Sequence, residues 1–433
     1  MNRFLAIVLL VTCSSVIGAI AQTPQATDLP GKPFFIKKTW IIGGEGNWDY
    51  LTMDPKTMQL FIPHGRIVQV VDVNTGQVVG QVTGLRDAHS VALDEEGQYG
   101  FVTDGGAASV IVFDRSSYQV IARIPTANNP RAAVFDASTG LVFAVCPDTT
   151  PEANPQRRGQ SPSRRAAPEV QSTITVIDPQ SHKRLADVLV PNQLGFAQAD
   201  GRGTVYINDV KLNHVIYLHT QTVVSQIQNG LQRMETGAKA NNADGKDNAS
   251  DGNDGTDKHR SETRDYLVVD WTPQSQQSTD NIPNQLHSLS IGGGCVAPHG
   301  LAIDAADNRL FVACENMRMV VLNTEDGSQV TTLPIGAGND ALGFDADRGL
   351  IYASNGGGVG SLTIIRRDVV DTYHVIQELP TQARARTLAV NPDNGNVYLV
   401  TNVVGFDLNH DGGIGGLQTA AVPGSFRVLV VGN

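Results

Sequence analysis

The chain has 433 residues, a formal net charge of −11, 44 glycines and 6% aromatic residues. This acidic balance, with no basic stripe to offset it, argues against a nucleic-acid partner, because such binding draws its affinity from neutralised phosphates. Length alone suggests two or three domains, but large closed all-β folds are exceptions to that rule.

The first 21 residues have the pattern of a secretory signal. Arg3 is followed by an apolar run and then by Ala19-Ile20-Ala21, so we expect cleavage after Ala21. The run is short for a membrane anchor, and we expect no membrane span after cleavage. The pattern predicts an exported protein, periplasmic or extracellular, in which residues 22–33 form a linker.

From residue 34 onward the chain repeats a unit of four short apolar runs separated by turn residues, which is typical of a four-stranded antiparallel meander. Each first run ends at an acidic or amide residue whose side chain can fix the following turn. These positions are Asp54, Asp94, Asp136, Asp200, Asp304, Asp345 and Asn391. Three of the six intervals are near 40 residues. Four strands at that period indicate a propeller blade.

The two ends of the repeat region complement each other. Phe34–Ile42 has the pattern of a fourth strand with no blade before it, and Ser425–Val431 that of a third strand with no fourth after it. Pairing them closes a ring and removes both exposed edges. We therefore predict an all-β fold over residues 34–433: a single seven-bladed β-propeller of four-stranded antiparallel blades, closed by the N-terminal strand.

The repeats resemble the YVTN-type, YncE-like seven-bladed propellers of exported bacterial proteins. The matching segments are Val397–Asn402 (VYLVTN), its weaker copies Val205–Asn208 and Phe101–Asp104, the turn Asp72–Gly76, Pro298–Asp304 and Pro423–Val430. WD40 repeats share the period, but the repeats lack their Gly-His and Trp-Asp landmarks; Trp48-Asp49 occurs once and at the wrong place. The resemblance covers roughly residues 34–433 apart from insertions. It implies the fold and a binding role, and no particular reaction, since one propeller hosts many functions.

Three insertions interrupt the blades, at 147–170, about 221–285 and 403–424. The first is rich in Pro, Ser and Arg, and the second contains a polar run at 241–258, so we expect neither to supply an ordered core. The third strand of blade 4 is either Val215–His219, at the better distance from Asp200, or Leu267–Asp270, with the better sequence. We favour the first; the second would place the insertion on the top side.

A ring of mostly ionisable residues lies five positions before the seven anchors, where first strands begin at the top mouth of the channel. The ring consists of Asp49, His89, Arg131, Gly195, His299, Asp340 and Arg386. Convergent charge in a funnel is typical of a ligand site, although these groups could also neutralise one another and hold water. We predict that the six ionisable members bind an unknown small molecule or protein.

Residues 406–414 match the first part of a calcium-binding loop. Asp407, Asn409 and Asp411 alternate along it and Gly412 stands at the sharp bend, as a hard cation requires. Gln418 occupies the place of the usual bidentate Glu. The segment is therefore either a calcium-binding loop or a Gly-rich turn without metal. We predict no other cofactor.

Signal cleavage leaves three cysteines, an odd number for an exported protein. Cys295 lies in the connection into blade 5, and Cys314 ends the second strand of the same blade, so both lie on the top side. We predict a disulfide between them and a free thiol at Cys146.

These observations together favour an exported non-catalytic protein that binds a ligand or partner through its top face. Two enzyme classes stay open. One is a metal-dependent lactonase or ester hydrolase, with the metal held by Asp49, His89, His299 or Asp340. The other is a propeller subunit of a redox enzyme with a bound quinone or haem, although no C-x-x-C-H motif is present. We find no nucleophile with a partnered base.

Overall fold

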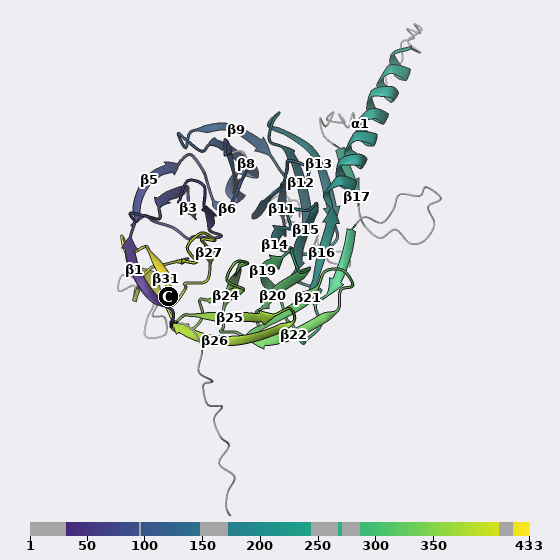
Figure 1. The fold of residues 1–433 in the computed structure, drawn as a ribbon. Helices are drawn as coiled ribbons and strands as arrows, with labels where there is room; N and C mark the ends of the chain where they lie inside the picture. The colour runs from purple at the N-terminus through teal and green to yellow at the C-terminus, as the bar shows by residue number, and fades with distance from the viewer. Residues whose placement is uncertain (1–31, 95–96, 148–171, 244–266, 271–285, 407–418) are drawn as a thin grey trace, which may run out of the picture. The chain divides into compact units, whose positions relative to one another are not determined.

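The computed structural model describes residues 32–94, 97–147, 172–243, 267–270, 286–406 and 419–433. Residues Pro33–Asn433 form one compact unit. Within it, seven sheets of antiparallel strands stand in a ring (Figure 1). The prediction of a seven-bladed all-β propeller is confirmed. The predicted signal peptide lies outside the described residues.

Each blade runs from an inner first strand to an outer fourth strand. Blade 1 contains β2 (Thr52–Asp54), β3 (Gln59–His64), β4 (Ile67–Asp72) and β5 (Gln77–Val82). Blade 2 contains β6 (Ala88–Leu93), β7 (Tyr99–Asp104), β8 (Ser109–Asp114) and β9 (Val120–Pro125), with the 3-10 turn η1 (Gly105–Ala107). Blade 3 contains β10 (Ala132–Asp136), β11 (Leu141–Cys146), β12 (Ser172–Asp178) and β13 (Lys183–Val190).

The remaining blades follow the same order. Blade 4 contains β14 (Leu194–Ala199), β15 (Thr204–Asp209), β16 (His214–His219) and β18 (Leu286–Ser290). Blade 5 contains β19 (Pro298–Asp304), β20 (Arg309–Cys314), β21 (Arg318–Asn323) and β22 (Gln329–Pro334). Blade 6 contains β23 (Asn339–Asp345), β24 (Leu350–Asn355), β25 (Ser361–Val369) and β26 (Thr372–Pro380). Blade 7 contains β27 (Leu388–Val390), β28 (Val397–Thr401), β31 (Arg427–Gly432) and β1 (Phe35–Ile41).

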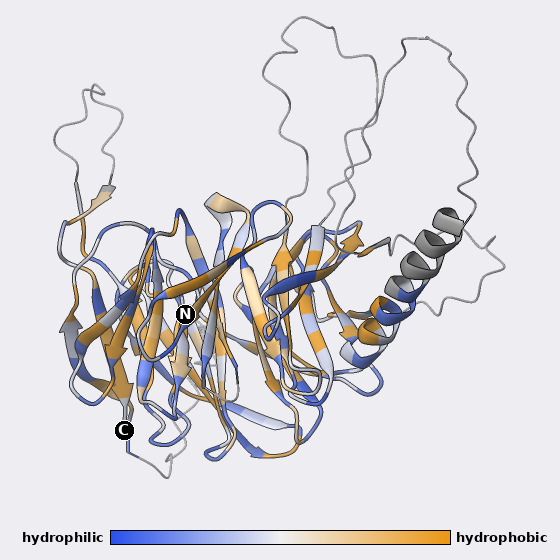
Figure 2. Cartoon of the chain, turned by 90° about the horizontal axis from the view of Figure 1, so that it is seen from above, coloured by the Kyte–Doolittle hydropathy of each residue, from blue (hydrophilic) through white to orange (hydrophobic). Residues whose placement is uncertain are grey.

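The inner strands form an unbroken ring around the channel. The first strand of each blade contacts the first strand of the next blade, from β2 and β6 round to β27 and β2. Neighbouring blades pack face to face; Phe61 of blade 1, for example, packs with Ile111 and Phe113 of blade 2. Middle strands are buried on both faces, so they are apolar along most of their length, and Figure 2 shows this hydrophobic colour on the strands.

Closure by the N-terminal strand is also confirmed. Strand β1 pairs antiparallel with β31, with Thr39 opposite Leu429. Trp40 of β1 stacks on Tyr398 with ring centroids 5.9 Å apart. It also covers Gly76 of blade 1, where an added Cβ would lie 2.5 Å from the indole and where φ is +77°. The strand therefore completes blade 7 and contacts blade 1.

The favoured third strand of blade 4 is confirmed as β16. It is followed by a helix that the sequence analysis did not predict, α1 (Thr220–Ala243). Val223 and Ile227 of this helix pack into the core shared by blades 3 and 4, and their i, i+4 spacing is the sequence signal for it.

The alternative segment, β17 (Leu267–Asp270), adds a fifth strand to blade 3, parallel to β13. Because the insertion joins the third and fourth strands of blade 4, it leaves the ring on the bottom side. The rest of its polar run, from residue 244 to 258, lies outside the described residues.

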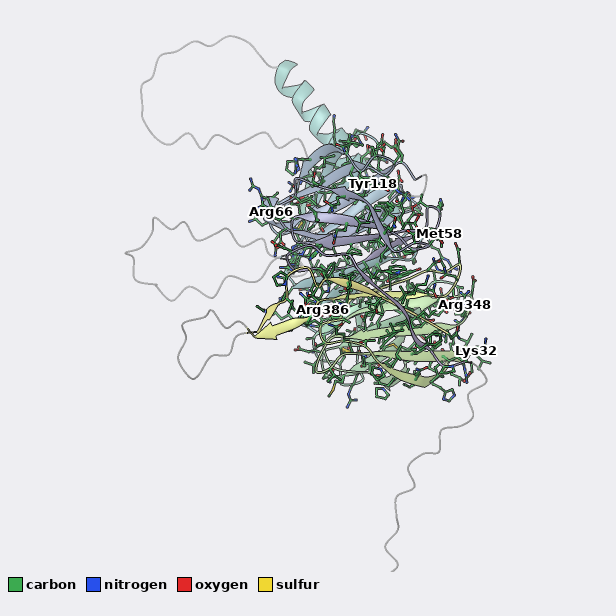
Figure 3. All side chains as sticks on the ribbon, turned by 90° about the vertical axis from the view of Figure 1, so that its left-hand side faces the viewer. Lys32, Met58, Arg66, Tyr118, Arg348 and Arg386 are labelled. Atoms are coloured by element: carbon green, nitrogen blue, oxygen red, sulfur yellow. A yellow bond between two sulfur atoms is a disulfide. The ribbon has the colours of Figure 1, made fainter. Side chains whose placement is uncertain are left out.

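The top side is the one on which second strands turn into third strands. Figure 3 shows Arg66, in such a turn, and Arg386 toward one side of the ring, with Met58 and Arg348 toward the other. The 147–170 insertion joins β11 to β12 and so leaves from the top, although only residue 147 of it is described. Strands β29 (Val404–Phe406) and β30 (Thr419–Ala421) form a hairpin between β28 and β31, also on top.

Candidate ligand site at the channel mouth

The seven ring positions lie at the start of the inner strands, as the sequence predicts. His89, Gly195, His299 and Asp340 fall in the first residues of β6, β14, β19 and β23, and Asp49, Arg131 and Arg386 shortly precede β2, β10 and β27. Because these strands contact one another around the channel, the seven residues form its upper rim.

Hydrogen bonds between blades hold the backbone of this rim. The carbonyl of Arg131 accepts from Thr103 Oγ1 at 3.0 Å. The carbonyl of His299 accepts a hydrogen bond from Asn208 Nδ2 at 2.8 Å, and the carbonyl of Arg386 accepts one from Ser354 Oγ.

Each donor occupies the same position in the second strand of the preceding blade: the Thr position of the YVTN-like segment. In the sequence, this segment is recognised only as a signature of the repeat. A buried hydroxyl or amide at a fixed place in an otherwise apolar strand is the signal that could have revealed its role.

Two pairs of side chains contact each other on the rim. Asp49 Oδ2 lies 2.9 Å from His89 Nδ1, with the two side chains 16% and 8% exposed. Asp340 Oδ2 lies 2.8 Å from Arg386 Nε. Asp87, outside the predicted set, approaches the other nitrogen of His89 at 3.1 Å, without the alignment of a hydrogen bond. Burial raises the pKa of Asp340, and the charges of Arg386 and His299 oppose that rise.

An aromatic pair fills the channel just inside the rim. Tyr50 of blade 1 and Phe196 of blade 4 each follow a rim residue, and their ring centroids lie 4.4 Å apart. Since these blades are not neighbours, this contact spans the channel. The pKa of Tyr50 is raised well above its usual value, first by burial and then by Asp49 and Asp340, while Arg131 and Arg386 oppose the rise. We call this rim of mostly ionisable residues, together with the aromatic pair Tyr50 and Phe196 just inside it, the cup. The sequence does not predict the aromatic pair.

The side of the cup formed by blades 3 to 5 is basic. Arg131 is exposed, and no described carboxylate lies within ion-pair distance of it. His299 is half-buried on the other side of Gly195, which contributes no side chain. A Cβ at Gly195 would approach Val210 Cγ2 at 3.0 Å. The cup therefore offers a guanidinium without a described acidic partner and a half-buried imidazole.

A hollow of about 220 Å³ lies on the top side between blades 7 and 1, away from the channel mouth. It is lined by Gly44, Glu45, Gly46, His64, Asn402, Ala421, Val422, Pro423 and Phe426. His64 is buried, stacks on Phe426 at 3.9 Å and bonds Gln69 Oε1 through Nδ1 at 2.9 Å. Burial lowers the pKa of His64. Its ring is thus engaged in packing that holds the two blades together.

Asp407, Asn409 and Asp411, the predicted calcium ligands, lie outside the described residues. Within the described ranges, no group of three or more His, Cys, Asp or Glu side chains is placed to hold a metal ion.

The predicted disulfide is present in blade 5. Cys295 and Cys314 are bonded, with Cα atoms 5.4 Å apart. Cys146 is a buried free thiol, and burial raises its pKa to about 12. Across the described part of the chain, no helix has the length and apolar character to cross a membrane.

Comparison with known proteins identifies the fold. No family model matches the chain, and no curated protein matches its sequence. The chain is similar to a solved structure described as "Structure of U3-55K", with a TM-score of 0.57 and 8% identity over 90% of this chain and 97% of that one. It is also similar to "Crystal structure of RRP9 WD40 repeats", with a TM-score of 0.58 and 7% identity over 90% and 96%. At such identities the likeness shows the fold alone: a seven-bladed propeller with WD40-like structural neighbours.

Proposed function

We propose that this chain is an exported, YncE-like binding protein that takes a small carboxylate at the mouth of its channel. Arg131 carries the proposal, because its guanidinium is exposed, has no described acidic partner and is near enough to Tyr50 for its charge to oppose the rise in the pKa of that group. A guanidinium suits a planar carboxylate, which it can bind through two parallel hydrogen bonds. The half-buried His299 and the aromatic floor add a polar contact and apolar area, the combination common in ligand sites.

The rim pairs support binding over hydrolysis. Asp49 and His89 engage each other, and Asp340 engages Arg386, so three of the four side chains named for a catalytic metal already have protein partners. The signal-like N-terminus and the disulfide support export, since disulfides persist in oxidising compartments.

Titration with a panel of acetate, succinate, citrate and benzoate tests the proposal, with binding followed by ligand-observed NMR. We expect at least one member to bind and the Arg131→Ala variant to bind it about tenfold more weakly or worse, since a hydrogen bond to a charged group contributes about 1.5–3 kcal/mol. Arg66→Ala removes an exposed top-face arginine away from the rim and serves as the charge-matched control. Equal losses in both variants, or no binding of any member, would contradict the proposal.

A further inference from the structure

The outer part of blade 4 carries a histidine pair unrelated to the channel mouth. His219 ends β16 and His287 lies on β18, and their ring centroids are 5.4 Å apart at an interplanar angle of 60°. Tyr217 pairs directly with His287 across the two strands, so His219, two residues further on, is the diagonal neighbour on the same face.

Neighbouring side chains hold both rings. Tyr217 stacks on His287 with centroids 4.8 Å apart and contacts His219 edge-on at 5.6 Å. Thr204 Oγ1 lies 3.4 Å from Nδ1 of His219, which leaves Nε2 as the nitrogen free of that contact. A fixed partner on one ring nitrogen determines which nitrogen can bind a metal.

The separation of the rings fits a shared metal ion. Zinc lies 2.0–2.1 Å from a coordinating imidazole nitrogen, and therefore roughly 3.2 Å from the ring centre. Two centres 5.4 Å apart then subtend an angle of about 115° at the ion, close to the tetrahedral value that zinc prefers.

Both imidazoles are accessible to a metal ion. His219 is exposed and His287 half-buried, so an ion has access and water can complete its coordination.

We propose that His219 and His287 form a two-histidine site for a divalent transition-metal ion, with Zn²⁺ as the best geometric match. The site lies on the outer strands of blade 4 and is independent of the carboxylate proposed for the channel mouth. Imidazole ligands also suit Cu²⁺ and Ni²⁺, so these ions compete for the same pair.

Isothermal titration of the whole, untagged chain with Zn²⁺ alone tests this site. We expect wild type to bind one zinc ion at this site, and we expect His219→Asn and His287→Asn each to bind it with at least about a tenfold lower affinity, because loss of a direct ligand costs no less than loss of an outer-shell partner. The double variant should bind no more weakly than either single variant.

His214→Asn is the matched control, because His214 lies on the same strand but contacts Ser288 Oγ at 3.0 Å, away from the pair. It should retain wild-type affinity, and zinc should raise the melting temperature of wild type and of this control but not of the two ligand variants. Zinc binding that survives both single substitutions, or no binding by wild type in the micromolar range, would overturn the proposal.

Discussion

At the residue scale, single polar side chains in the second strands connect neighbouring blades. Thr103 is fully buried, donates to the carbonyl of Arg131 and accepts from the backbone N–H of Ser90. Asn208 and Ser354 likewise donate to the carbonyls of His299 and Arg386. The conformation of the rim therefore depends on residues that never face the channel.

Replacing Thr103 by Val keeps its shape but removes its donor and acceptor. We expect the free energy of unfolding to fall by about 1–3 kcal/mol, because buried polar groups of two blades lose their partner. Urea denaturation measures this, with Thr331→Val on the outer strand β22, where the side chain is partly exposed, as the control. A change no larger than that of the control would show that these bonds do not stabilise the ring.

The rim illustrates how much of the site the sequence predicts. A fixed offset from each turn anchor places Asp49, His89 and the others near the start of the inner strands, because each anchor ends or directly follows a first strand. The same offset cannot predict that Tyr50 and Phe196 meet. That contact joins blades 1 and 4, and it depends on the channel diameter, which no local pattern encodes.

At the element scale, arginines tie the bottom turns of adjacent blades together. Arg115, in the turn between β8 and β9, bridges Asp54 of blade 1 and Asp94 of blade 2, and all three side chains are buried. Burial alone would raise the pKa of Asp54, but hydrogen bonds from Thr57 and Arg115 outweigh it and lower the pKa. The folded carboxylate therefore adds stability above the unfolded pKa of about 3.9, and this contribution is lost as the pH falls through the lower folded pKa.

Arg115→Met should consequently cost about 3–5 kcal/mol at pH 7, because it leaves buried carboxylates without a counter-charge. The difference from wild type should shrink below about pH 4, where those carboxylates become protonated in the variant. Denaturation at pH 7 and pH 3 measures both values. Arg123→Met, at an exposed arginine of the same blade that bonds only the Gly84 carbonyl in the described structure, should show a small and pH-independent change. A constant deficit for Arg115→Met would rule out the electrostatic explanation.

The elements themselves differ in how far sequence predicts them. Strands such as β20 and β24 are recognised because their apolar runs alternate with Asp- and Gly-rich turns. Helix α1 is missed because, among the side chains described for it, the apolar ones that pack on the core are Val223, Val224 and Ile227, too few for a clear helical period. The sequence offers β17 only as the less favoured third strand of blade 4, and its pairing with β13 is not predicted, since four apolar-to-acidic residues carry no information about their partner strand.

At the scale of the whole molecule, the ring exists because its two ends share blade 7. Strand β1 covers the outer edge of β31 and brings Trp40 against Gly76 of blade 1. Without it, β31 would expose an unpaired strand edge, and the contact between blades 7 and 1 would lose an aromatic side chain.

Deletion of residues 33–41 should therefore lower the melting temperature and cause concentration-dependent self-association, because open edges pair with other chains. Sedimentation velocity at several concentrations measures the association. Ile41→Ser, at an end of β1 where the side chain is 68% exposed, keeps the pairing and should stay monodisperse to the same degree as wild type. A deletion variant as stable and as monodisperse as wild type would mean that β1 is not needed for closure.

The central functional claim is that the closed ring presents a basic cup for a carboxylate. An experimental density map of the protein, crystallised with the member of the carboxylate panel that binds most tightly, tests it most directly. We expect carboxylate density within hydrogen-bonding distance of the Arg131 guanidinium, above Tyr50 and Phe196. A bound ligand elsewhere on the molecule, with only ordered water in the mouth, would contradict it.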